Sequence, residues 1–243
     1  MLVVIPMAGA GKRFAEAGYS APKPLIDVLG KIMIQRVVEN LELDEAKHIF
    51  VVQQEHRRKY NLDEKLKEIC KASCEVYETK GLLSGALLSV LEARNSLNVD
   101  EELIITNSDQ LVVTKPELMI STLRENEADG GFMTFKASGK SWSYALVNER
   151  GHVEEVAEKK EISNNATIGV YYWKSSRYFL HCADKFISRK ITTNGEYYVS
   201  PVFNEAIFEG KKIMAIESTK HVSLGTPELL KDFIDQQGFL DAK

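Results

Sequence analysis

The sequence predicts an α/β fold in which a mixed, mostly parallel central sheet is flanked by helices. Short apolar runs typical of buried strands alternate with segments whose apolar residues recur at helical spacing. The runs at 2–5 and 103–106 lack polar alternation, as expected for central parallel strands buried on both faces. The expected strands are Leu2–Ile5, Ile49–Gln53, Leu103–Thr106, Phe132–Phe135, Tyr144–Val147, Thr167–Trp173 and Ile213–Ile216.

Helices are expected between the early strands and near the end of the chain. Apolar residues recur with a period of about 3.6 residues over 32–41, 63–69 and 84–97. An amphipathic segment at 227–236 follows Thr226, a residue type that caps helix N-termini. The charged run 54–59 predicts a solvated helix start directly after a strand.

After about residue 130 the pattern changes to short strands separated by glycine and polar turns. Gly130-Gly131, the segment 136–143 and Glu149-Arg150-Gly151 indicate antiparallel hairpins, and so a small antiparallel β lobe. The chain contains no internal repeat and no low-complexity linker. We therefore expect a single domain, 1–243, whose halves at 1–130 and 131–243 share one sheet.

Composition limits the classes of partner. The chain is 44% apolar and 27% charged, which is ordinary for a globular protein, and its net charge of −4 gives no electrostatic case for nucleic-acid binding. No apolar run is long enough for a membrane span, and no signal peptide is expected. The three cysteines are sparse and odd in number, which favours free thiols in a reducing cytoplasm.

The loop after the first strand is the strongest functional signal. It contains Ala8, Gly9, Ala10 and Gly11, then the cations Lys12 and Arg13, and Lys23 follows between Pro22 and Pro24. Small residues let backbone N–H groups approach an anion closely, and consecutive N–H groups form a concave anion site. Three nearby cations indicate a polyphosphate ligand. The loop is neither a P-loop nor a dinucleotide fingerprint, and its small residues could also serve only to pack a strand-to-helix turn.

A second candidate site follows the buried run that ends at Thr106. Asp109, in the segment Asn107-Ser108-Asp109-Gln110, would lie at the carboxyl end of a central strand. Ligands bind outside this end of such sheets, so Asp109 is placed to hold Mg²⁺ against phosphates in the first loop. The alternative is that Asp109 only caps the following turn.

These motifs resemble those of the sugar-phosphate nucleotidylyltransferases, or NDP-sugar pyrophosphorylases. The resemblance extends in order through Gly81, the Ser84-Gly85-Ala86 turn, Glu158-Lys159, Asn165-Ala166, the segment 168–171 with Gly169, Gly195-Glu196 and Gly225-Thr226-Pro227. It spans nearly the whole chain. It implies a Rossmann-like, GT-A-like nucleotidyltransferase fold with a nucleotide-binding first half and an acceptor-binding second half.

The resemblance also implies an activity and residue roles. An NTP and a sugar-1-phosphate would give an NDP-sugar and pyrophosphate by Mg²⁺-dependent in-line attack, without a covalent intermediate. Such enzymes commonly serve surface-polysaccharide biosynthesis. The resemblance assigns the β- and γ-phosphates to Arg13, the α-phosphate and attacking phosphate to Lys23, and Mg²⁺ to Asp109. It assigns nucleotide binding to Ala8, Gly9, Ala10, Gly11, Lys12, Gly81, Ser84 and Gly85, and acceptor binding to Glu158, Lys159, Asn165, Gly169 and Glu196.

The chain departs from the family pattern at three positions. Ala8 replaces the usual first glycine, Lys160 replaces a proline, and Ser223 stands where many members have a second metal-binding Asp or Asn. Three alternatives stay open: a cytidylyltransferase for a small non-sugar phosphorylated acceptor, a GT-A glycosyltransferase, and a non-catalytic NDP-sugar binder. The sequence leaves open the base, the acceptor, and whether the protein is a monomer or a homodimer.

Overall fold

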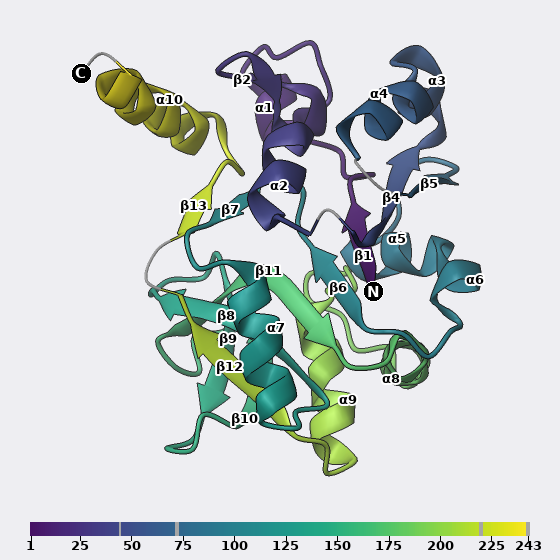
Figure 1. Ribbon diagram of the computed structural model, residues 1–243, viewed down its shortest axis with the longest axis vertical. Coiled ribbons are helices and arrows are strands. Elements are labelled where there is room, and N and C mark those ends of the chain that lie inside the picture. The colour runs from purple at the N-terminus through teal and green to yellow at the C-terminus, as the bar shows by residue number, and fades with distance from the viewer. Residues whose placement is uncertain (44, 71–72, 219–220, 242–243) are drawn as a thin grey trace.

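One nine-stranded sheet runs through both halves of the chain (Figure 1). The computed structural model describes residues 1–43, 45–70, 73–218 and 221–241. The strand order is β10-β9-β11-β6-β1-β4-β5, with β8 paired to β11 and β12 paired to β8. These strands are β1 (Leu2–Pro6), β4 (Lys47–Gln53), β5 (Cys74–Thr79), β6 (Leu103–Thr106), β8 (Gly130–Lys136), β9 (Ser143–Val147), β10 (Val153–Glu158), β11 (Asn165–Trp173) and β12 (Ile213–Glu217).

Two small sheets and the helices complete the fold. β2 (Asp27–Val28) pairs with β3 (Lys31–Ile32), and β7 (Gln110–Val112) pairs with β13 (His221–Ser223). The helices are α1 (Lys12–Glu16), α2 (Met33–Leu41), α3 (Gln54–Lys59), α4 (Leu62–Ile69), α5 (Ala86–Glu92), α6 (Arg94–Leu97), α7 (Pro116–Glu125), α8 (Ser176–Ser188), α9 (Phe203–Phe208) and α10 (Pro227–Asp241). Two 3₁₀ turns, η1 (Lys23–Leu25) and η2 (Ser200–Val202), stand between them.

The central strands are buried on both faces, and their alternate residues feed two cores. Leu2 and Val4 of β1 pack with α5, α6, α8 and α9 on one face, whereas Val3 and Ile5 pack with α2, α4 and α7 on the other. A strand covered on both faces loses all polar alternation, which is why the sequence displayed these strands so clearly. The predicted mixed sheet flanked by helices is confirmed.

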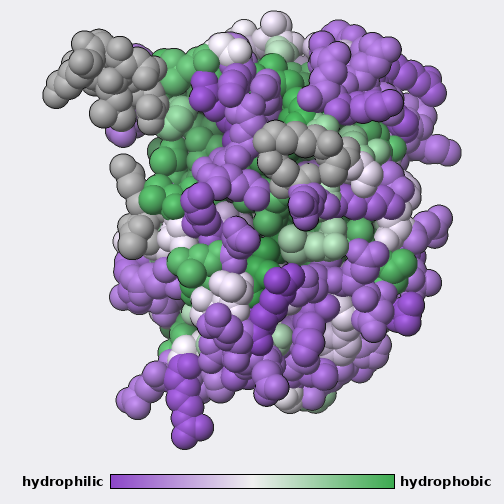
Figure 2. All heavy atoms as spheres, in the orientation of Figure 1, coloured by the Kyte–Doolittle hydropathy of each residue, from purple (hydrophilic) through white to green (hydrophobic). Residues whose placement is uncertain are grey.

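The predicted elements are found, with differences at several boundaries. The segment expected as one helix over 84–97 is divided at Ala93 into α5 and α6. β5, whose side chains are mostly half-buried, and β10 were not among the expected strands, and α7, α8 and α9 were not among the expected helices. Charged residues cover the corner built by α3 and α4 (upper right in Figure 2), as expected for the solvated run 54–59.

The two halves meet where β6 contacts its neighbours. β6 is parallel to β1 on one side and antiparallel to β11 on the other. The hairpin strands of the second half therefore continue the central sheet instead of forming a separate one. Within the part of the chain that the structure describes, no helix combines the length and apolar character that crossing a membrane requires.

Gly169 permits the closest contact at this junction. Its φ is +94°, and a Cβ at this position would lie 2.2 Å from Nδ2 of Asn107. The Asn107 N–H also donates to the Gly169 carbonyl oxygen at 2.9 Å. A side chain on residue 169 would force the Asn107 side chain to move.

We expect Gly169→Ala to lower the free energy of unfolding by about 1–3 kcal/mol through backbone strain and overpacking. The matched control is Gly139→Ala, because Gly139 has a similar φ of +98° but nothing within 4 Å of its Cβ position. Urea denaturation of both variants separates the cost of the clash from the cost of the left-handed backbone. Equal destabilisation by the two substitutions would contradict the role of this contact.

Candidate active site

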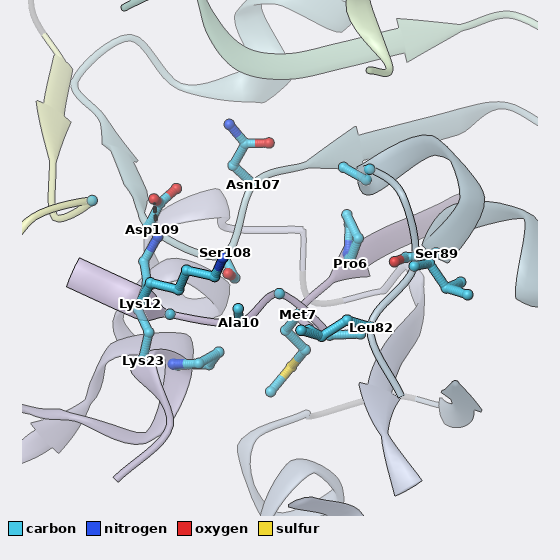
Figure 3. A pocket seen from close by; sticks show the side chains of 18 of the residues that line it. Pro6, Met7, Ala10, Lys12, Lys23, Leu82, Ser89, Asn107, Ser108 and Asp109 are labelled. Atoms are coloured by element: carbon cyan, nitrogen blue, oxygen red, sulfur yellow. Dashed lines mark hydrogen bonds and ion pairs between the residues drawn. The ribbon is translucent and has the colours of Figure 1, made fainter. Parts of the chain in front are cut away.

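A cleft of about 550 Å³ opens at the carboxyl ends of β1 and β6 (Figure 3). β1 lies between β4 and β6, so the connections leaving β1 and β6 diverge and leave a crevice at this edge. The lining residues are Pro6 to Phe14, Lys23, Pro24, Leu82, Leu83, Gly85, Ala86, Ser89, Asn107, Ser108, Asp109, Glu196 and Gly225. Both predicted phosphate-site segments therefore line one cleft.

The loop after β1 is held by a side chain from the neighbouring strand. Gln53, at the end of β4, donates from Nε2 to the carbonyl oxygens of Ala8 at 3.0 Å and Gly9 at 3.2 Å. Gly11 has a φ of +60° and ends the loop, after which α1 begins at Lys12. Lys12 and Arg13 are exposed at the start of this helix. The loop thus has a fixed backbone and two cations that can reach an anion.

Lys23 reaches into the cleft from a rigid turn. Pro22 and Pro24 flank it, and the Leu25 N–H donates to the Pro22 carbonyl oxygen at 2.8 Å to close the 3₁₀ turn. The Lys23 ammonium forms an ion pair with Oδ2 of Asp109, and the two side chains are only 20% and 15% exposed. Figure 3 shows these side chains pointing toward one another. The structure therefore brings together two of the three predicted catalytic residues, with Arg13 on the same cleft wall.

Asp109 occupies the bend between β6 and β7. Its carbonyl oxygen accepts from the Leu224 N–H at 2.8 Å, which joins this bend to the C-terminal segment. Its Oδ1 accepts from Nε2 of Gln110 at 3.3 Å, and no backbone N–H of the described residues donates to its carboxylate. The predicted alternative of a turn-capping aspartate is therefore not what the structure shows; the carboxylate faces the cleft and Lys23.

Ser223 lies beside Asp109, at the position where the family resemblance led us to expect a second metal ligand. Gln110 Nε2 donates to Ser223 Oγ at 3.2 Å, and a Cβ on Gly225 would lie 2.9 Å from Asp109 Oδ2. No group of three or more His, Cys, Asp or Glu side chains in the described segments could hold a metal. Mg²⁺ commonly binds one or two carboxylates together with substrate phosphates and water. These residues fit an ion shared with a substrate, held on the protein side by Asp109.

The predicted base-recognition segment is fastened to the second half of the chain. Gly85 has a φ of +113°, and a Cβ there would lie 2.2 Å from the Tyr197 carbonyl oxygen. The Tyr197 N–H donates to the Ser84 carbonyl oxygen at 2.8 Å, and the Leu87 N–H donates to the Tyr197 carbonyl oxygen at 3.1 Å. Gly85 lines the cleft, whereas Ser84 and Gly81 stand outside its lining.

The predicted acceptor residues Glu158, Lys159 and Glu196 are linked by polar contacts. Lys159 has a φ of +56° and donates from Nζ to the Tyr198 hydroxyl, which in turn donates to Glu196. Glu196 lines the main cleft. The Glu158 carboxylate accepts hydrogen bonds from Ser143 and, at 3.4 Å, from Ser200.

The other two predicted acceptor residues lie apart from this group. Gly169 is buried and contacts Asn107, which lines the cleft. Asn165, at the start of β11, accepts from Lys136 Nζ at 2.6 Å and is absent from the lining of the cleft. Its direct role in acceptor binding stays a prediction.

Several residues of the site were not predicted from the sequence. Gln53 holds the loop, and Leu82 and Ser89 line the cleft. Only long-range packing gives these side chains their places. The position of Gln53 at the end of a strand next to β1 was the one local indication available.

Comparison with known proteins agrees with the fold. The sequence profile of the nucleotidyl transferase family matches residues 2–221, and the chain belongs to this family. The predicted resemblance is therefore confirmed at the level of the family, and with it a transferase activity.

Two curated relatives and one solved structure show the extent of the similarity. The chain is 24% identical over 237 residues to the UTP–glucose-1-phosphate uridylyltransferase AglF of Haloferax volcanii, covering 94% of this chain and 93% of that protein. It is 26% identical over 175 residues to a bifunctional sugar-1-phosphate nucleotidylyltransferase/acetyltransferase of Sulfurisphaera tokodaii, covering 70% of this chain but only 40% of that protein. The nucleoside-diphosphate-sugar pyrophosphorylase of Vibrio cholerae RC9 superimposes with a TM-score of 0.83 at 23% identity, over 96% of this chain and 100% of that one.

Burial raises the pKa of Glu158 above its ordinary value of 4.5, and the Ser143 and Ser200 hydrogen bonds and the Lys159 charge only partly offset this. The native protein then holds this proton more tightly than the unfolded chain, so stability falls as pH rises from 4.5 through the raised pKa. We expect Glu158→Gln to remove this fall. Urea denaturation from acidic to neutral pH measures the free energy of unfolding of both proteins. Relative to the wild type, that of the variant should increase as the pH rises through that window.

The matched control for this measurement is Glu155→Gln, which removes an exposed carboxylate from the same strand, β10. A stability difference between Glu158→Gln and the wild type that is constant with pH would contradict the raised pKa.

Proposed function

We propose that this protein joins an NTP and a sugar-1-phosphate to give an NDP-sugar and pyrophosphate. The observation that carries the proposal is the meeting of Lys23 and Asp109 beside the small-residue loop, in one cleft. A half-buried cation next to a carboxylate suits a site that must receive both phosphates and a divalent metal. The uridylyltransferase and pyrophosphorylase names of the similar proteins support the same reaction.

The nucleotide would bind in the part of the cleft nearest the loop. The backbone N–H groups of Ala8 to Gly11 would surround the triphosphate, with Lys12 and Arg13 neutralising its β- and γ-phosphates. The base would lie against the segment that contains Gly81, Ser84 and Gly85. Hydrogen bonds from backbone groups of this segment would select the base.

The acceptor would bind toward Glu196, at the other end of the cleft. Lys159 would bind its phosphate, and Glu158 and Glu196 would accept hydrogen bonds from its hydroxyl groups. Gly169 would serve indirectly by holding Asn107 at the cleft wall, and Asn165 would support the strand that carries it.

In the proposed mechanism the acceptor's phosphate oxygen attacks the α-phosphorus in line, and pyrophosphate leaves. This chain's own residues position the two phosphates and neutralise charge, so no nucleophile or general base of the protein is required. Lys23 would exchange Asp109 for the α-phosphate and the attacking phosphate. Arg13 would hold the leaving pyrophosphate. Mg²⁺, the divalent metal that we propose for Asp109, would polarise the α-phosphate when bound.

We further propose that the enzyme works in the cytoplasm as a monomer or a homodimer, without nucleic-acid or membrane partners. A role in surface-polysaccharide biosynthesis would accord with its product.

Two parallel measurements separate three sequence-based alternatives from this proposal. Pyrophosphate release is measured for each NTP with sugar-1-phosphates and with small phospho-alcohols, and binding of NDP-sugars is measured in parallel.

Release that depends on a sugar-1-phosphate supports the proposal. Release only with a phospho-alcohol and CTP favours the cytidylyltransferase. NDP-sugar binding without release favours a glycosyltransferase or a non-catalytic binder.

We expect Lys23→Ala to lower kcat for pyrophosphate release by about 10²–10³-fold, the cost of losing one positioned electrostatic donor. The control is Lys31→Ala, because Lys31 is an exposed lysine whose ion-pair partner is Glu39, 2.7 Å away. A rate near that of the wild type in Lys23→Ala would rule out the role given to Lys23.

We expect Ser223→Asp to tighten metal binding and Asp109→Asn to weaken it, because the first adds a carboxylate to the site and the second removes one, and negative charge around the site attracts the cation. Titration of the protein and NTP with Mn²⁺, followed by electron paramagnetic resonance, measures this without turnover. Removal of metal with EDTA should abolish pyrophosphate release, and added Mg²⁺ should restore it. Unchanged Mn²⁺ affinity in both variants would contradict a metal site at Asp109.

A further inference from the structure

The Ser223 hydroxyl lies in the wall of the main cleft, beside the carboxylate of Asp109. Ser223 is half-buried on β13, which pairs with β7, the strand that begins directly after Asp109. Gly225 lines the cleft, and a Cβ on it would lie 3.2 Å from Ser223 Oγ and 2.9 Å from Asp109 Oδ2. Since Gly225 has no side chain, the two oxygens border the same space in the cleft wall.

Two donors point at the Ser223 hydroxyl oxygen. Nε2 of Gln110 donates to it at 3.2 Å, and the Gly225 N–H donates to it at 3.3 Å. A hydroxyl group has two lone pairs and one proton. Because both lone pairs accept hydrogen bonds, the oxygen has none left for a metal ion. Its proton has no acceptor among the described residues and can be donated to a ligand.

Gln110 fixes this arrangement from the interior of the protein. It is only 7% exposed, and its Nε2 also donates to Asp109 Oδ1 at 3.3 Å. A carboxylate only accepts hydrogen bonds, so the amide must turn its N–H groups toward Asp109 and Ser223. Its Oε1 is left buried without a donor among the described residues. Asp109 therefore sets the orientation of the amide, and the amide in turn makes the Ser223 hydroxyl a donor.

A hydroxyl proton at this place suits an anionic ligand. The Lys23 ammonium pairs with Oδ2 of Asp109, the carboxylate oxygen that borders the space over Gly225. In the proposed mechanism Lys23 leaves Asp109 for the α-phosphate, which brings that phosphate beside Ser223. Phosphate oxygens are strong acceptors, and hydrogen bonds to charged groups are stronger than those between neutral groups.

We propose that Ser223 donates a hydrogen bond to the α-phosphate of the nucleotide and does not ligate the metal. The position at which the family resemblance led us to expect a second metal ligand thus contributes to phosphate binding in this chain. Gln110 is the positioning residue that orients both Asp109 and Ser223. The inference rests on the proposed function and adds a residue to its nucleotide site.

The test measures nucleotide binding with and without metal. Isothermal titration calorimetry follows UTP, CTP, ATP, GTP and dTTP binding to the full chain without acceptor, in Mg²⁺ and in EDTA. The NTP that the wild type binds most tightly, and its monophosphate by competition, are then measured on Ser223→Ala. We expect about tenfold weaker binding in both buffers, the effect of losing one hydrogen bond to a charged group. The loss should be equal for the NTP and the monophosphate, because both carry the α-phosphate.

Ser223→Thr is the matched variant, because it keeps the hydroxyl group and should bind the nucleotide like the wild type. Titration with Mn²⁺, followed by electron paramagnetic resonance, gives the metal affinity of each protein without nucleotide. Ser223→Ala should leave this affinity unchanged, because the Asp109 carboxylate is retained. Thermal unfolding of both variants checks that they are folded.

Each outcome decides the inference. Weaker nucleotide binding by Ser223→Ala that persists in EDTA and that Ser223→Thr reverses supports it. Unchanged nucleotide affinity, a loss confined to the NTP, a loss that Ser223→Thr shares, or weaker Mn²⁺ binding overturns it. A loss seen in Mg²⁺ but absent in EDTA also overturns it. Where the wild type binds nucleotide only with Mg²⁺, the Mn²⁺ affinities decide between a phosphate donor and a metal ligand.

The proposed function and this inference can fail separately. Pyrophosphate release together with unchanged nucleotide affinity in Ser223→Ala would sustain the proposed function while overturning the inference. A wild-type protein that binds no NTP in either buffer would count against the proposed function itself, and the inference would fall with it.

Discussion

The pairing of β6 with two different neighbours is the constraint on which the site depends. β6 runs parallel to β1 and antiparallel to β11, so the loop after β1, Asp109 and β11 are held together in one sheet. The contact between Gly169 and Asn107 lets β11 approach closely at this edge. A bulkier residue 169 would force the Asn107 side chain to move at the point where the proposed substrates meet.

Around this junction, segments distant in the sequence hold one another in place. Gly85 accepts the close approach of the Tyr197 backbone, Gln53 fixes the loop after β1, and Leu224 holds the bend at Asp109. The polar groups of the cleft are thereby positioned by backbone contacts from well-packed elements. Such prior positioning is what charge stabilisation in a transferase requires, since the groups need not reorganise during reaction.

The ion pair of Lys23 with Asp109 has a further physical consequence. Both side chains are largely shielded from water, where an isolated charge would be costly. Each therefore compensates the other until ligands arrive. Under the proposed mechanism, phosphate and metal would replace this internal pair with two new ones, so that the charge of the cleft stays balanced at both stages.

Much of the fold and part of the site could be predicted from the sequence. β1 and β6 were evident because strands buried on both faces are uniformly apolar. The loop and Asp109 were evident because they directly follow these two strands, and Lys23 because Pro22 and Pro24 flank it. The half-buried strand β5 was not evident, and neither was the break at Ala93 between α5 and α6. At both places, packing against neighbouring elements overrides the weak secondary-structure preference of the local sequence.

The sequence by itself determined the class of fold, the small-residue loop after β1 and the family resemblance, since these depend on local periodicity and on motifs of neighbouring residues. Only the tertiary structure decided that Lys23 pairs with Asp109, that Tyr198 joins Lys159 to Glu196, and that Gln110 donates to Ser223. These contacts join residues far apart in the chain. Their geometry follows from the register of the sheet and the packing of helices on it, which no local pattern of residues encodes.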